Sequence, residues 1–252
     1  DKDNNTGTAI TFDIDDLGTG SATSGSDYTA FPGAAQVTVA DGSNVGTYTV
    51  VVSNDALVEG TETVIAQISG SSNTDVTIGT ASATANLLDN DTSEVSISAN
   101  DPTATETGST PGQFTVDLGA VNNTGGPVTV SYTISGTATD GGTDYTTISG
   151  VVTIADGAQT ALIDVTGIAD DALLESDETV VMTITGTNNT LFTIDAANDD
   201  ATVTIVDNDT AQANLSVTQH GNEDGTVSIV YTVTLDKDNN TGTAITFDID
   251  DL

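Results

Sequence analysis

Acidic side chains gather at three separated places in one half of the chain. Glu106 stands by itself, a dense acidic run occupies 170–178, and Asp207 and Asp209 flank a single asparagine. The rest of the chain has counterparts of all three places, at 55–62, at Asp89 and Asp91, and at Glu223. Two carboxylates about 4 Å apart repel by roughly 4 kcal/mol at an effective dielectric constant near 20, so a pocket that collects several of them needs a compensating cation.

The residues expected to share such pockets form two sets. The first is Glu106, Asp170, Asp171, Glu175, Glu178, Asp207 and Asp209, and the second is Asp55, Glu59, Glu62, Asp89, Asp91 and Glu223, with Asn54 at the place of Asp170. Calcium suits this donor set because it takes six to eight oxygen ligands and accepts carboxylates, carbonyls and asparagine together. Zinc prefers His or Cys, and the chain has one His and no Cys. Proton uptake and simple solvation of exposed loops are the alternatives.

Internal repetition organises the chain. Residues 1–17 recur without change as 236–252, which predicts that the chain is a window from a longer repeat with a period of 235 residues. A looser repeat of half that length is also present, since Asp27-Tyr28-Thr29 recurs as Asp144-Tyr145-Thr146. Asp27 and Asp144 fit a turn-forming role and a ligating role about equally.

Apolar residues alternate with Thr and Ser over many short segments, a pattern typical of strands that bury one face. The alternation is clear in 128–134 and in 226–235, and turns rich in Gly, Asn and Asp separate such segments. Strands are expected near 94–99, 113–118, 127–134, 150–155, 161–167, 179–185 and 201–206. Seven short strands in about a hundred residues predict an all-β fold of tandem immunoglobulin-like antiparallel β-sandwiches.

These strands set the expected domain boundaries. Residues 92–208 form a complete module, and residues 1–91 hold the last five strands of a module whose first two strands are missing from the window. Residues 209–252 hold the first strands of the next module, with 236–252 identical to 1–17. The duplicate therefore marks the place where one two-module unit continues into the next.

Composition narrows the function. The net charge is −36 with only two basic residues, Lys2 and Lys237, yet 36% of the residues are apolar and periodically placed, which argues against disorder. Too few cations are present to neutralise phosphates, so nucleic acid is not an expected partner. The chain has no run of about twenty apolar residues, so membrane insertion is not expected. Because it has no cysteine, whatever stiffens the modules is expected to be noncovalent. No activated nucleophile or carboxylate pair with opposed roles is evident, so an enzyme is not expected.

Several motifs together resemble the Calx-beta domain family. They are Gly136-Thr137-Ala138-Thr139 followed by Asp144-Tyr145, then 168–184 and 205–209, with counterparts at 20–29, 53–68 and 87–91. The resemblance implies a calcium-binding sandwich in which the loop before the sixth strand and the terminal acidic triplet hold the metal. It points by position to Asp170, Asp171, Glu175, Glu178, Asp207 and Asp209, with Glu106 as the ligand from the first strand. Asn54, Asn90 and Asn208 depart from the acidic pattern.

The functional hypothesis follows from repetition, acidity and the absence of covalent crosslinks. We expect a calcium-binding structural segment of a giant secreted bacterial protein at the cell surface, acting as a calcium-rigidified extender of an adhesin or as the body of an extracellular fibre or sheath. Its expected partners are adjacent copies of the same repeat, in the chain and laterally in a fibre. The alternative is a calcium-sensing or lectin-like ligand-binding module.

Overall fold

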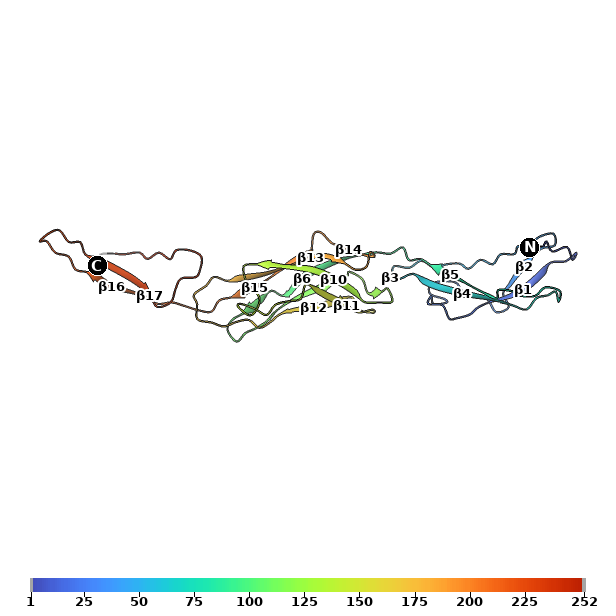
Figure 1. Ribbon diagram of the computed structural model, residues 1–252, viewed down its shortest axis with the longest axis horizontal. Helices are drawn as coiled ribbons and strands as arrows, with labels where there is room; N and C mark the ends of the chain where they lie inside the picture. Colours follow the sequence, from blue (N-terminus) through green and yellow to red (C-terminus); the bar gives the residue numbers. More distant parts are fainter. Residues whose placement is uncertain (1, 251–252) are drawn as a thin grey trace. The chain divides into compact units, whose positions relative to one another are not determined.

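The computed structural model describes residues 2–250, which are all β (Figure 1). They divide into two compact units, residues 2–92 with 121–126 and residues 93–120 with 127–250. Among the described residues there is no helix that is long and apolar enough to cross a membrane. The expected all-β class is confirmed, and the sheets are those of tandem immunoglobulin-like sandwiches.

Two sheets build the sandwich of the second unit. The first sheet has, in spatial order, β11 (Val151–Ile154), β10 (Val128–Gly136), β13 (Glu178–Thr187), β15 (Asp200–Val206) and β7 (Thr103–Thr105). The second has β12 (Thr160–Val165), β8 (Gly112–Asp117), β6 (Ser93–Asp101) and β14 (Phe192–Ile194). Neighbours are antiparallel except that β7 runs parallel to β15 and β14 runs parallel to β6.

The core of this unit lies between the two sheets, since β15 contacts both β6 and β8. Alternate residues of each strand point into it, as the period of two requires. Fully buried side chains come from both sheets: Phe114, Val116, Val128, Val130, Val180, Met182 and Val203 are each 0% exposed. Burying such side chains contributes roughly 1.5–3 kcal/mol each, so this sandwich has a core of its own.

The first unit has one main sheet. Its antiparallel order is β2 (Gln36–Val39), β1 (Ile10–Asp16), β4 (Glu62–Ser69) and β5 (Ser82–Leu87). A short parallel pair, β3 (Val58–Glu59) with β9 (Asn122–Asn123), belongs to the same unit. An open apolar hollow of about 460 Å³, lined by Ile14, Phe31 and Val64 among others, lies against the sheet. Within this unit the sheet is not fully covered by a second layer.

The last strands of the chain form a hairpin of β16 (Ala213–Gln219) and β17 (Val230–Leu235). The alternation in 226–235 predicts one buried face, and that expectation is wrong for this hairpin: Ile229 is 56% and Tyr231 59% exposed. Within residues 2–250 the hairpin is a sheet of two strands to which no further strand is paired, and its apolar residues are left exposed.

All seven strands expected between residues 94 and 206 are present, each within two residues of its expected bounds at most ends. Three short strands within residues 92–208 lie outside the expected set: β7, β9 and β14. Each has two or three residues and pairs in parallel with a strand far away in the sequence. Such pairs leave no local pattern that could predict them.

A close backbone approach explains one glycine of the sequence motifs. A Cβ on Gly136 would lie 2.1 Å from the carbonyl oxygen of Thr179, and φ at Gly136 is 117°. The counterpart Gly20 has the same 2.1 Å approach to Thr63. Only glycine fits at these positions. At Gly136 it allows the end of β10 to approach the backbone of β13 closely.

Candidate metal site

In each unit one carboxylate connects the end of a strand to a loop rich in acidic residues. The strand is β15 in the second unit and β5 in the first, and the acidic loop is residues 170–178 or 54–62. Asp207 accepts hydrogen bonds from the backbone N–H of Glu175 at 3.0 Å and from that of Asp209 at 3.0 Å. In the first unit Asp89 accepts from the N–H groups of Glu59 at 2.9 Å and Asp91 at 3.2 Å. Both units therefore fix the Asp-Asn-Asp exit in the same way.

The acidic loop is shaped by a second repeated turn. Asp171 accepts a hydrogen bond from the backbone N–H of Leu173 at 2.7 Å, and Asp55 accepts one from Leu57 at 2.9 Å. Asx turns of this kind are why Asp is favoured in loops. These carboxylates keep one further oxygen each for another partner.

A parallel strand pair brings the isolated Glu106 to the site. β7 pairs with β15 in the register Thr105 to Val206, and the backbone N–H of Glu106 continues the ladder to the carbonyl of Val206 at 3.3 Å. Carboxylate oxygens of Glu106, Asp207 and Asp209 consequently lie within 4.8 Å of one another. This is the acidic cluster of the second unit.

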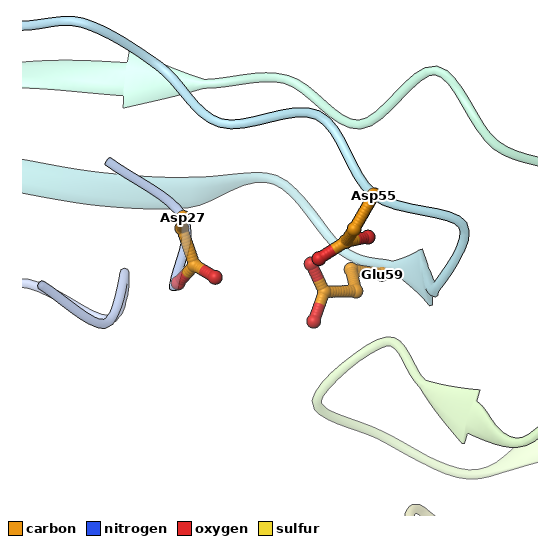
Figure 2. A group of neighbouring side chains, drawn as sticks. All are labelled: Asp27, Asp55 and Glu59. Atoms are coloured by element: carbon orange, nitrogen blue, oxygen red, sulfur yellow. The ribbon is translucent and has the colours of Figure 1, made fainter. Parts of the chain in front are cut away.

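The first unit has its own acidic cluster, composed of Asp27, Asp55 and Glu59, whose oxygens also lie within 4.8 Å of one another (Figure 2). Asp55 and Glu59 face each other across the acidic loop, and Asp27 comes from a separate segment. The surrounding pocket is also lined by Asn54, Glu62, Asp89 and Asp91.

Burial and mutual repulsion perturb the glutamates of both clusters. Burial, helped by the charge of Asp207, raises the pKa of Glu106 to about 7. Burial also raises the pKa of Glu62 and of Glu178 to about 7, with a further contribution from hydrogen bonds to Asp27 and Asp144 respectively. Burial also raises the pKa values of Glu59 and Glu175, and the charges of neighbouring aspartates raise them further.

Three carboxylate oxygens around the clusters are buried and accept no hydrogen bond. They are Oε2 of Glu62, Oε2 of Glu106 and Oδ2 of Asp209. A buried acceptor without a partner costs about 1–3 kcal/mol, and more when charged. Calcium would satisfy these atoms directly, since carboxylate and amide oxygens are its ligands. The donor set therefore fits calcium.

The remaining residues of the predicted sets lie outside the two clusters. Asp170 accepts a hydrogen bond from the side-chain amide of Asn208 at 3.3 Å, so this asparagine contributes to the acidic loop. The Asn54 amide donates to the carbonyl of Asp55 at 3.1 Å. Glu178 lies near Glu175 and Glu106, whose charges help to raise its pKa. Glu223 is exposed in the turn between β16 and β17, in the other unit from Asp55 and Glu59.

The sequence left the role of Asp27 open, and the structure shows the turn-forming role while placing the side chain where it could also bind a metal ion. One oxygen of Asp27 accepts a hydrogen bond from the backbone N–H of Thr23, and the side chain also belongs to the acidic cluster while only 8% exposed. Asp144 repeats the turn through Thr139, and its proximity contributes, after burial, to the raised pKa of Glu178. The signal for both was the repeated Asp-Tyr-Thr motif.

A family model for the Calx-beta domain matches residues 5–91 and 89–209. No curated protein sequence matches the chain significantly. Among solved structures, a crystal structure described as CBD12 from CALX1.2 is 17% identical over 79% of this chain and 88% of that chain, with a TM-score of 0.36. The apo form of the Calx CBD1 domain is 22% identical over 45% of this chain and 99% of that chain, with a TM-score of 0.35.

Proposed function

Because the chain belongs to the Calx-beta domain family, a family of calcium-binding modules, we propose that its acidic clusters bind calcium. The observation that carries the proposal is the set of buried carboxylate oxygens without donors at Glu62, Glu106 and Asp209. In the second unit the ligands are Glu106, Asp207 and Asp209, supported by Asp170, Asp171, Glu175 and Glu178. In the first unit they are Asp27, Asp55 and Glu59, supported by Asn54, Glu62, Asp89 and Asp91.

We further propose that the bound calcium has a structural role. Asp207 and Asp89 each join the acidic loop of their unit to the exit of the last strand, and without a cation the like charges there oppose that arrangement. A ligand that binds only the folded state stabilises it by about 2.7 kcal/mol at a concentration one hundred times its Kd. Calcium thus stiffens module ends that no disulfide secures.

This structural role supports the wider proposal of a repeated extracellular segment, an extender of an adhesin or the body of a fibre or sheath, with adjacent copies of the repeat as its partners. A net charge of −36 and an identical seventeen-residue segment at two places suit a repeated spacer in a calcium-rich medium. We assign it no catalytic role.

Calorimetric melting of the full chain tests the calcium proposal. Saturating calcium should raise Tm by several degrees over excess chelator, and magnesium at the same concentration should do less because it demands a tighter octahedral site. An unchanged Tm together with no heat of calcium binding would refute calcium binding. Surface localisation and imaging of the native protein test the wider role: intracellular protein, or a calcium-driven conformational change coupled to another domain, would favour the sensing alternative.

A further inference from the structure

One of the two basic residues of the chain lies on the acidic cluster of the second unit. The ammonium group of Lys237 forms an ion pair with Oδ1 of Asp209, and their side chains are only 26% and 14% exposed. The other oxygen of Asp209, Oδ2, is buried and has no hydrogen-bond partner. Lys237 therefore contacts one of the two carboxylate oxygens of Asp209, a proposed calcium ligand.

The segment that carries Lys237 is held in place on both sides. Before it, Asp236 exchanges two hydrogen bonds with the backbone of Gln212, at 2.7 and 3.0 Å. After it, the backbone N–H of Asn240 donates to the carbonyl of Leu174 at 2.9 Å. Ser176 then donates its hydroxyl to the carbonyl of Thr241 at 2.9 Å. The contact with Asp209 is thus supported by four further hydrogen bonds and is not a chance approach of a free side chain.

The first unit has no such cation. Its acidic pocket contains Asp91, the counterpart of Asp209, and is lined by no basic residue. In the sequence, Ala120 stands two residues before Asn122, whereas Lys237 stands two residues before Asn239 in the matching Asn-Asn-Thr-Gly turn. The ion pair at Asp209 therefore has no basic counterpart in the pocket that contains Asp91.

We propose that Lys237 is a tethered cation that competes with calcium for Asp209, so that the acidic cluster of the second unit binds calcium more weakly than it otherwise would. The inference rests on the proposed calcium binding. Calcium coordination by Asp209 brings a divalent ion beside the ammonium group, and the two cations repel. Binding there displaces the Lys237 side chain, while the first cluster binds calcium without that competition.

Calorimetric calcium titration of the full chain tests the competition. Lys237→Ala should tighten one class of sites by about three- to tenfold, a modest range because the ion pair is partly exposed. Lys237→Arg keeps the charge and should stay close to the unchanged protein. Lys2→Ala is the matched control, because Lys2 lies in the identical sequence Asp-Lys-Asp-Asn-Asn-Thr-Gly but is exposed; its affinity should stay within about twofold of the unchanged protein.

A second variant locates the effect. In an Asp209→Asn background, Lys237→Ala should no longer tighten binding, because the shared ligand charge is gone. Lysine-selective isotope labelling gives a direct readout, since the chain has only two lysines: calcium should shift the side-chain resonance of Lys237 and leave that of Lys2 in place. Unchanged or weaker binding in Lys237→Ala overturns the competition, as does an unmoved Lys237 resonance at saturating calcium. Absence of calcium binding in the unchanged protein would instead refute the proposed function itself.

Discussion

The backbone N–H of Glu175 donates to Oδ2 of Asp207 at 3.0 Å, which ties the acidic loop to the exit of β15. The same carboxylate accepts the N–H of Asp209 at 3.0 Å through its other oxygen. Asp207 is therefore an organising residue of the pocket as well as a proposed calcium ligand. Its two roles can be separated by substitution.

Asp207→Ala and Asp207→Asn remove the same charge, but only asparagine keeps an acceptor oxygen. In excess chelator we expect the alanine variant to be less stable than the asparagine variant by about 1 kcal/mol, because alanine leaves both backbone donors without a partner whereas asparagine leaves only one. Urea unfolding of both variants measures the difference. Equal free energies of unfolding would mean that the hydrogen bonds of Asp207 do not organise the pocket.

Glu106→Gln should act in opposite directions with and without calcium. Glu106 lies in the cluster with Asp207 and Asp209, and one of its oxygens has no donor. At about pH 8 in chelator, loss of its charge relieves repulsion and should raise the free energy of unfolding by about 1 kcal/mol. Calcium affinity should fall by about tenfold, because a charged ligand becomes neutral.

The control for this substitution is Glu94→Gln in β6, where the side chain is exposed and outside the cluster. It should change neither the stability in chelator nor the calcium affinity. A loss of stability in chelator for Glu106→Gln would contradict the prediction, since it would mean that the Glu106 charge is satisfied within the protein alone.

Calcium-free protein should become more stable as the pH falls from about 7.5 to about 5. Folding raises the pKa of Glu62, Glu106 and Glu178 from 4.5 to about 7, chiefly by burial. Between these values the folded chain binds more protons than the unfolded chain, and stability then falls with rising pH. Melting in chelator across this range tests the sign.

Saturating calcium should remove or reverse this pH dependence, because calcium requires the ionised carboxylates and protons compete with it. The calcium affinity should therefore rise with pH through about 7. A pH-independent affinity across this range would show that these glutamates lie outside the binding site.

Gly136→Ala should destabilise the second unit by more than about 2 kcal/mol. The added methyl group would lie 2.1 Å from the carbonyl oxygen of Thr179, and φ of 117° is unfavourable for any residue with a Cβ. Gly186→Ala in β13 is the matched control, since no atom lies within 4 Å of its Cβ position. Urea unfolding should separate the two, and similar losses would refute the close-approach explanation.

Local pattern predicted the strands well, and the reason is physical. Alternating Val, Ile and Thr in segments such as 128–134 can bury one face only when extended, so β10 and its neighbours follow from the sequence. Parallel β7 is different: it has three residues and pairs with β15 about a hundred residues later. Pairing over that separation depends on the packing of the whole sandwich.

The acidic site, like the fold, could be predicted only in part from the sequence. The sequence alone determined that carboxylates recur in matched sets, that their donor chemistry suits calcium, and that Glu106, Asp207 and Asp209 belong to one set. It could not show how Glu106 reaches the others, because only the β7–β15 register carries that residue to Val206 and the strand exit. Nor could it decide between the two roles of Asp27, which accepts a turn hydrogen bond from Thr23 and also lies in the acidic cluster of the first unit.

Tertiary structure alone also decided where the rare positive charge lies. Lys2 and Lys237 occupy identical sequences, yet Lys237 pairs with Asp209 whereas Lys2 is exposed. The difference arises because the segment after β17 is hydrogen-bonded to the acidic loop at Leu174 and Ser176. Composition determines how many charges a chain has, but an ion pair requires a backbone that holds the two side chains together.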